Sequence, residues 1–268
     1  MKLVDIGANL THNSFEQDFE KIIREASEAG LAHIIVTGTD LETSKAGQVM
    51  CTKHPKFLSS TVGFHPHISK TITDSDIEAV AELSCLPHVV AIGEIGLDFN
   101  RNFSPAEHQL RVFEQLLELA AELHKPVFLH QRDAHDAFYE LLKNYQSKLV
   151  GGVVHCFTDN EKALADYLEL DMHIGITGWI CDERRGGLLQ SLVAKIPDNR
   201  LLIETDSPYL FPRTLLQKQG RHRNEPKYLT EIVNVISHFR RQDPDTVAQN
   251  TTRNAIRLFG LNNELTEN

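Results

Sequence analysis

Short apolar runs rich in Val, Ile and Leu recur along the chain, separated by stretches whose apolar residues follow helical spacing. Runs of about four to eight such residues are typical of strands that are buried on both faces of a sheet. The pattern predicts strands at residues 3–8, 33–38, 59–64, 89–95, 126–130, 150–157, 173–177 and 201–205.

Helical spacing is clearest at residues 104–124. The apolar stripe there consists of Val112, Leu116, Leu119, Ala120 and Leu123. Ser104 and Pro105 are typical of a helix cap and a first helical turn. A second helix at residues 16–29 ends before Gly30, a residue type that stops helices by entering the left-handed region. Two closing helices are predicted at about residues 228–260.

Strand and helix therefore alternate through the chain, which favours a parallel sheet. Eight such units in a chain of 268 residues match the usual size of a (β/α)₈ TIM barrel. A doubly wound open sheet would more often stop at about five or six strands. No linker, low-complexity segment or glycine-rich phosphate loop interrupts the pattern, so we expect one domain over residues 1–268.

Composition and charge narrow the class of protein. The chain is 41% hydrophobic and 24% charged, which is ordinary for a globular protein. It has no signal-type segment and no apolar run near the ~18 residues of a spanning helix, so we expect a cytoplasmic protein without a membrane partner. The four cysteines form no CxxC pair, which argues against a zinc ribbon or a disulfide framework.

A net charge of −10 argues against a protein that coats nucleic acid through a broad basic surface. A local basic loop follows the last predicted strand and contains Lys218, Arg221, Arg223 and Lys227. This loop is either a contact for phosphate or simply a solvated segment, and the sequence leaves both readings open.

Four potential metal ligands each lie near the end of a separate predicted strand: Glu94, His130, His155 and Asp206. The carboxyl ends of parallel strands meet at one rim of a barrel, so we expect these side chains to form a divalent metal site. Singly, a His at a strand end is more often a hydrogen-bonded structural residue, and an Asp or Glu often caps a helix. The Glu and two His suit Zn²⁺ or Mn²⁺, and the oxygen donors leave Mg²⁺ open.

Several motifs follow one another along the chain: Gly63-Phe64-His65-Pro66-His67, Gly93-Glu94-Ile95-Gly96-Leu97-Asp98, Leu129-His130-Gln131-Arg132-Asp133-Ala134, His155-Cys156-Phe157-Thr158, Glu204-Thr205-Asp206-Ser207-Pro208-Tyr209 and Arg223-Asn224-Glu225-Pro226. In order and spacing they resemble the motifs of the TatD-type metal-dependent hydrolases. Residues 96–103 and 176–186 resemble the TatD DNase subfamily itself. The resemblance implies an amidohydrolase-type barrel and a Mg²⁺-dependent 3′-to-5′ exonuclease acting on single-stranded DNA or RNA. A role in DNA repair or nucleic-acid turnover would follow from the family alone.

The first predicted strand departs from the family pattern. Most members carry Asp-x-His-x-His there, whereas this chain has Asp5 followed by Gly7 and Asn9. The resemblance then implies one well-formed ion on Glu94, His130 and His155, and a second ion held weakly by Glu94, Asp206, water and substrate phosphate. Fewer imidazoles shift the expected ion from Zn²⁺ toward Mg²⁺ or Mn²⁺.

The resemblance and phosphodiester chemistry together suggest roles for further residues. Asp206 and Glu94 are the expected catalytic groups, with Asp206 accepting a proton from the attacking water. Phosphate contacts are predicted for His65, Arg132, Arg221 and Arg223, although Arg132 has the alternative of a salt bridge to Asp133 or Asp98. Phe157, Trp179 and Tyr209 are candidates for stacking on unpaired bases, although each residue taken alone favours packing.

Two other functional classes remain open from the sequence. The same fold and metal ligands also suit hydrolysis of a small amide, ester or phosphoester. A binding protein that has lost catalysis is the third hypothesis, because Gly7 and Asn9 replace the two family histidines. The complete set of Glu94, His130, His155 and Asp206 argues for an enzyme. We expect it to act as a monomer on single-stranded ends.

Overall fold

The computed structural model describes residues 2–216 and 223–262 of the chain. Its strands form an eight-stranded sheet in which the strand order follows the chain order, β1 to β8. The strands are β1 Leu3–Ala8, β2 Leu31–Val36, β3 Leu58–Val62, β4 Val89–Asp98, β5 Val127–Arg132, β6 Gly152–Val154, β7 His173–Ile176 and β8 Leu201–Ile203. The predicted alternation of strands and helices is confirmed.

Helices follow the strands along the chain. The α-helices are α1 Phe19–Glu28, α2 Leu41–Lys53, α3 Asp74–Ser84, α4 Ala106–Glu122, α5 His135–Tyr145, α6 Glu161–Glu169, α7 Gly187–Leu192, α9 Leu229–Arg240 and α10 Pro244–Phe259. Short 3₁₀ helices are η1 Asn13–Phe15, η2 Pro66–Thr71, η3 Gly178–Cys181, η4 Val193–Lys195, η5 Arg213–Leu215 and η6 Pro226–Tyr228. The two predicted closing helices correspond to α9 and α10.

Two strands, β4 and β6, differ most in length from the prediction. β4 continues past residue 95 to Asp98, because its parallel pairing with β5 extends to the Asp98–Arg132 position. β6 is shorter than predicted and ends at Val154. Cys156 has a φ of 46°, which is incompatible with an extended strand. The apolar run at residues 150–157 therefore does not predict the residue at which β6 ends.

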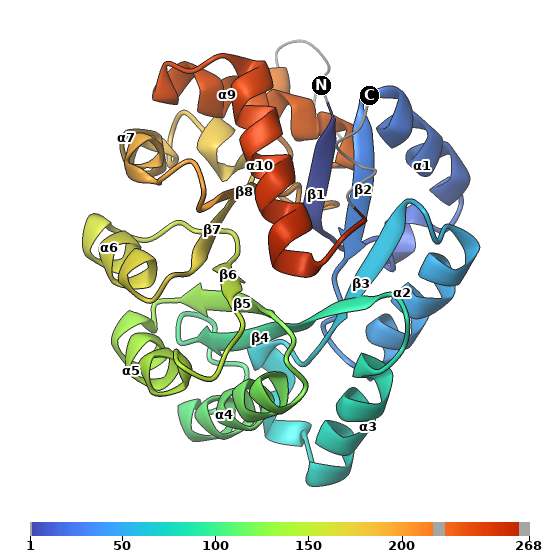
Figure 1. The fold of residues 1–268 in the computed structure, drawn as a ribbon, viewed down its shortest axis with the longest axis vertical. Coiled ribbons are helices and arrows are strands. Elements are labelled where there is room, and N and C mark those ends of the chain that lie inside the picture. The colour runs from blue at the N-terminus through green and yellow to red at the C-terminus, as the bar shows by residue number, and fades with distance from the viewer. Residues whose placement is uncertain (1, 217–222, 263–268) are drawn as a thin grey trace. The chain divides into compact units, whose positions relative to one another are not determined.

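The described residues fall into two compact units. The first unit comprises Met1–Val36, Cys156–Leu164 and Ile174–Asn268. Within it, β1 pairs in parallel with β2, and β7 with β8. Helix α10 packs against β1 and β8 (Figure 1). At the end of α1, Gly30 has a φ of 97°, as expected for a residue that stops a helix.

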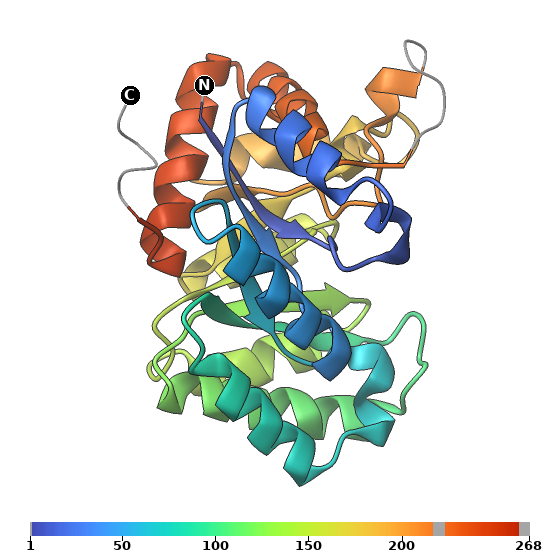
Figure 2. The same cartoon turned by 90° about the vertical axis from the view of Figure 1, so that its right-hand side faces the viewer.

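The second unit comprises Thr37–His155 and Ala165–His173. Its strands β3, β4, β5 and β6 pair in parallel in that order. Helices α2, α3, α4 and α5 contact one another in chain order (Figure 2). The apolar stripe of α4 is buried at Val112, Leu116, Leu119 and Ala120.

The prediction that Ser104 caps α4 is wrong. The residue at the cap position is Pro105, and no side chain caps this helix. The Ser104 hydroxyl instead donates to the carbonyl oxygen of His67 at 2.7 Å and accepts from the backbone N–H of Lys70 at 3.1 Å. Ser104 therefore ties η2 to the segment before α4, a long-range contact that local sequence cannot reveal.

Among the helices that the structure describes, none combines the length and the apolar character needed to cross a membrane.

Close approach of β4 and β5 leads to a stability prediction at Gly96. Its φ is 143°, and a Cβ atom there would lie 1.9 Å from the carbonyl oxygen of His130. Gly96→Ala should therefore strain the backbone and push β5 away, which destabilises the fold by about 2 kcal/mol. Scanning calorimetry should show a melting temperature that is lower by about 4–8 °C.

Gly187→Ala is the matched control, because a Cβ atom at Gly187, the first residue of α7, would meet no other heavy atom within 4 Å. Its melting temperature should stay within about 1 °C of the parent protein. Equal melting temperatures for the two variants would contradict the close approach at Gly96.

Candidate metal centre

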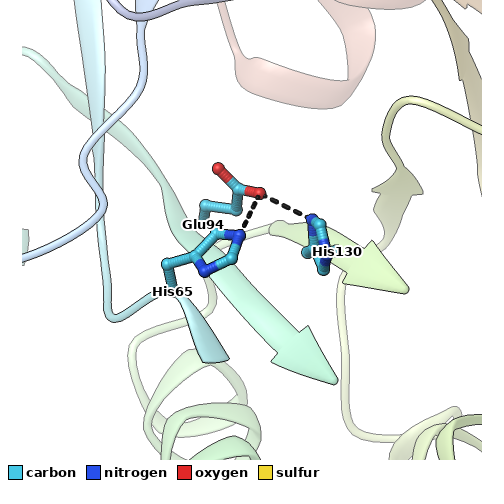
Figure 3. Close-up of side chains that lie close together, drawn as sticks. All are labelled: His65, Glu94 and His130. Atoms are coloured by element: carbon cyan, nitrogen blue, oxygen red, sulfur yellow. Dashed lines mark hydrogen bonds and ion pairs between the residues drawn. The ribbon is translucent and has the colours of Figure 1, made fainter. Parts of the chain in front are cut away.

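Three side chains of the second unit form a group that could hold a metal ion: His65, Glu94 and His130. Their ligand atoms all lie within 4.8 Å of one another (Figure 3). His65 precedes η2, Glu94 lies in β4, and His130 lies in β5. Backbone hydrogen bonds fix the first two, from His65 N–H to the Thr39 oxygen at 2.9 Å and from Glu94 N–H to the Gly38 oxygen at 2.7 Å.

One carboxylate oxygen is at the middle of this group. Glu94 Oε1 lies 2.9 Å from His130 Nδ1, 2.8 Å from His155 Nε2 and 3.4 Å from His65 Nε2. Glu94 and His155 are each only 5% exposed. The predicted ligands Glu94, His130 and His155 are thus brought together, and His65, predicted to bind phosphate, lies in the same group.

Glycines allow these strand ends to come close together. A Cβ atom at Gly93, directly before Glu94, would lie 2.5 Å from the backbone oxygen of Phe128 in β5. A side chain at this position would therefore separate Glu94 from His130. The glycines of the Gly93–Asp98 motif thus serve the packing of β4 on β5, rather than a turn.

The protonation states of His65 and Glu94 suit a metal ion. Burial lowers the pKa of His65 to about 3, against the opposing charge of Glu94, so this imidazole is neutral at pH 7. Burial alone would raise the pKa of Glu94, but His155, His65 and His130 outweigh it and hold the pKa well below its ordinary value. A carboxylate surrounded by imidazole nitrogens offers the donors that bind divalent cations. The residues present therefore fit a divalent ion.

Two residues that the sequence analysis did not assign to the site support His130. The Asp98 carboxylate oxygen Oδ2 lies 2.7 Å from His67 Nε2 and 3.6 Å from His130 Nε2. Asp98 is 1% exposed, and the backbone N–H groups of Asn100 and Arg101 donate to its Oδ1. Asp98 and His67 each lie in one of the motifs that resemble the TatD-type hydrolases. Only the register between β4 and β5 shows that Asp98 faces this cluster.

Asp206 belongs to the first unit, where it follows β8 with a φ of 53°. The Asn9 side-chain N–H donates to Asp206 Oδ1 at 2.9 Å, and the Asp206 backbone N–H donates to the Gly7 oxygen at 2.8 Å. Asn9 therefore contacts the carboxylate to which we attributed catalysis, a contact that the sequence analysis missed because it treated Asn9 only as a lost ligand.

A buried carboxylate lies beside this pair. Asp5 accepts from the backbone N–H of Thr205 at 2.9 Å and from its hydroxyl at 2.5 Å. Burial raises the pKa of Asp5 to about 7 in spite of these hydrogen bonds. Asp5 thus anchors Thr205, the residue before Asp206, and ties β1 to the segment after β8.

The predicted phosphate contacts have different surroundings. Arg132 is exposed, and among the described residues the structure gives it no ion pair. Arg223 donates to Asp18 at 2.6 Å and to Glu225 at 2.9 Å, and its guanidinium carbon lies 4.6 Å from the Phe15 ring centroid. Arg221 lies outside the described residues. The contacts of Arg223 give it a structural role, and its phosphate role stays a prediction.

The three residues considered for base stacking differ in exposure. Phe157 is 2% exposed, which agrees with the interpretation of this ring as a packing residue. Tyr209 is 53% exposed, and Trp179 is half-buried.

Comparisons with known proteins agree on a family. The family model of the TatD related DNases matches residues 4–260. The 3′-5′ ssDNA/RNA exonuclease TatD of Rahnella sp. (strain Y9602) is 48% identical over 260 residues, which cover 97% of this chain and 98% of the relative. The protein of the same name from Yersinia pseudotuberculosis serotype O:3 (strain YPIII) is 47% identical over 259 residues, which cover 97% of this chain and the whole relative.

Solved structures show the same likeness. The crystal structure of the TatD homolog YJJV from Escherichia coli K12 has a TM-score of 0.88 at 28% identity, and the match covers 97% of this chain and 98% of that one. A hydrolase TatD family protein from Entamoeba histolytica has a TM-score of 0.87 at 27% identity, with the same coverage. Together with the strand order, this likeness confirms the predicted (β/α)₈ fold class. The chain therefore belongs to the TatD related DNase family.

Proposed function

We propose that this protein is a divalent-metal-dependent 3′-5′ exonuclease that hydrolyses phosphodiester bonds of single-stranded DNA and RNA. The observation that carries the proposal is the buried Glu94 carboxylate, whose oxygen has three imidazole nitrogens within 3.4 Å. Curated relatives at 47–48% identity that bear the name 3′-5′ ssDNA/RNA exonuclease TatD supply the substrate class and the direction of cleavage.

His65, Glu94 and His130 would hold the ion, with His155 beside Glu94 as a further donor. When bound, a divalent ion polarises a phosphate oxygen and lowers the pKa of a bound water. Asp98 contacts His67 at 2.7 Å and lies 3.6 Å from His130 Nε2, so it would orient the two imidazoles as carboxylates commonly do for metal-binding histidines. The Mg²⁺ expected from the family resemblance remains a prediction. The nitrogen-rich donor set favours Mn²⁺ or Zn²⁺.

Asp206 is the proposed acceptor of the proton from the attacking water. The hydrogen bond from Asn9 holds one carboxylate oxygen of Asp206 in place. Asn9 is therefore proposed as a positioning residue. In this chain the amide takes the place of a family histidine without leaving Asp206 unsupported.

The remaining expectations from the sequence belong to the same proposal. Phosphate contacts by Arg132, Arg221 and Arg223, a monomeric state, a cytoplasmic location, one domain over the whole chain and a role in DNA repair stay predictions. Hydrolysis of a small amide, ester or phosphoester is the alternative, and no contact of the described residues favours it.

Metal binding tests the membership of His65 in the centre. Glu94→Gln, His130→Ala and His65→Ala should each weaken Mn²⁺ binding at least about tenfold in isothermal titration calorimetry, since each removes a donor. His108→Ala is the control, because the side chain of His108 is 40% exposed and, among the described residues, its ion pair is with Glu107 at 4.0 Å. Unchanged affinity in His65→Ala alone would return His65 to the substrate-binding role.

Substrate form tests the exonuclease. With each divalent ion in turn, a linear single strand labelled at its 5′ end should shorten progressively, because trimming starts at the 3′ end and leaves the label. The same strand labelled at its 3′ end should release its label as mononucleotide at once. A closed circular single strand should persist, and its rapid cleavage would show an endonuclease instead.

Asp206 and Asn9 can be tested together by steady-state kinetics. Asp206→Asn keeps the shape but cannot take a proton, so kcat should fall by about 10²–10⁴-fold. Asn9→Ala removes a hydrogen bond to a charged group, which is worth about 1.5–3 kcal/mol, so kcat should fall at least about tenfold with KM little changed. Near-normal turnover in Asp206→Asn would remove Asp206 from the mechanism.

A further inference from the structure

A pocket of about 440 Å³ lies in the first unit, between η3 with the turn after it and the loop that follows β8. None of the residues that line it belongs to the group around Glu94. Its lining combines the aromatic residues Trp179 and Tyr209 with Arg184, Arg185 and Arg213. Aromatic rings beside guanidinium groups are typical of surfaces that bind single-stranded nucleic acid.

The two segments that form the pocket are packed tightly on each other. A Cβ atom at Gly178 would lie 2.1 Å from the backbone oxygen of Leu210, so η3 and the loop after β8 are in direct backbone contact. The Asn224 side-chain N–H donates to the Tyr209 oxygen at 2.7 Å, which fixes the backbone that carries the exposed ring. The pocket is therefore held in shape before a ligand arrives, which reduces the entropic cost of binding.

A buried acid organises the arginines. Asp182 is 2% exposed and accepts from Arg184 Nε at 3.2 Å, from Arg184 Nη2 at 3.1 Å and from Arg185 Nε at 3.0 Å. Arg213 bonds Glu183 at 2.8 Å and has its Nε 3.5 Å from Asp182. One or two carboxylates cannot occupy all the donors of three guanidinium groups, each of which has about five N–H bonds.

The charge of this cluster is the reverse of that of the whole chain. Three arginines face two carboxylates, Asp182 and Glu183, which leaves one net positive charge, whereas the chain carries −10. The side chains of Arg184 and Arg185 are 57% and 55% exposed. Donors that are not bonded to Asp182 are thus accessible to an anion from solvent.

The aromatic residues provide stacking surfaces. The Arg185 guanidinium carbon lies 4.2 Å from the centroid of the Trp179 ring, within the distance of a cation–π contact. Tyr209 is 53% exposed, and the His12 ring lies edge-on to it with the centroids 5.8 Å apart.

We propose that this pocket binds one nucleotide unit of single-stranded nucleic acid, with the base on the rings of Trp179 and Tyr209 and the phosphate on Arg184 and Arg185. The choice of nucleic acid as the ligand rests on the proposed function. The pocket then adds a strand-holding site that is separate in its residues from the Glu94 centre.

Trp179 is the single tryptophan of the chain, so fluorescence excited selectively at tryptophan, and not at the tyrosines, reports on this pocket. The probe is a ten-nucleotide oligothymidylate, titrated into the full-length protein in EDTA so that no hydrolysis occurs. We expect saturable quenching of Trp179. Inorganic phosphate alone should not reproduce it, and equal quenching by phosphate would show a general anion site and overturn the proposal.

Two substitutions test the two halves of the pocket. Arg184→Gln with Arg185→Gln should weaken oligothymidylate binding about tenfold, measured by anisotropy of a labelled strand, and should reduce the slope of log K against log salt by roughly 1. The control is Arg24→Gln with Arg253→Gln, which changes the net charge equally on the exposed faces of α1 and α10. Tyr209→Ala should weaken binding about five- to tenfold, whereas Tyr209→Phe keeps the ring and should bind normally.

The arginine substitutions remove partners of the buried Asp182 and could impair folding. Tyr209 is exposed, so its variants test the pocket without this complication. With a divalent ion present, the Tyr209→Ala variant should raise KM by the same factor and leave kcat within about twofold. Hydrolysis by the parent protein together with unchanged binding and KM in Tyr209→Ala would overturn the pocket and leave the nuclease intact. Quenching without hydrolysis in any metal would keep the pocket and refute the nuclease.

Discussion

The burial of the Glu94 carboxylate is the constraint on which the candidate site depends. A charged group removed from water is costly unless partners compensate it. Here His130 and His155 lie within 2.9 Å of one oxygen, and His65 lies at 3.4 Å. The imidazole nitrogens that lie against the carboxylate in the folded chain are also the atoms that a divalent cation would bind. One set of side chains therefore serves both the burial of Glu94 and the binding of a metal ion.

Backbone packing supplies the precision that this arrangement requires. Gly93 and Gly96 allow β4 to approach β5 more closely than any side chain would permit, with the Phe128 and His130 backbones filling the space of the absent Cβ atoms. Asp98, at the end of the same strand, then reaches His67 and His130. The Gly93–Asp98 motif therefore contributes both to the metal centre and to the packing of β4 on β5. A substitution at its glycines would reduce the stability of the fold and displace the metal ligands.

Arginine residues near carboxylates fall into two kinds in this chain. Arg223 is enclosed by Asp18, Glu225 and the Phe15 ring, so its charge is largely satisfied within the protein. Arg184 and Arg185 share one buried acid, Asp182, and remain more than half exposed. The difference matters because a net charge of −10 repels a polyanion at long range. Exposed guanidinium groups in one place are then needed to bind a nucleic-acid strand. The exposure of these groups in the folded chain decides where the strand can bind.

The sequence by itself determined the alternation of strands and helices and the fold class, and it singled out Glu94, His130 and His155 as candidate ligands, because buried parallel strands leave a periodic apolar signal with polar residues at their ends. Only the tertiary structure decided that His65 joins Glu94, that Ser104 links η2 to α4 rather than capping it, that Asn9 supports Asp206, and that Arg184 and Arg185 share a buried acid. Most of these contacts join residues far apart in the chain, and their geometry is set by strand register and backbone approach. Local propensity carries no information on either, since it reports what each segment can form and not which side chains packing brings together.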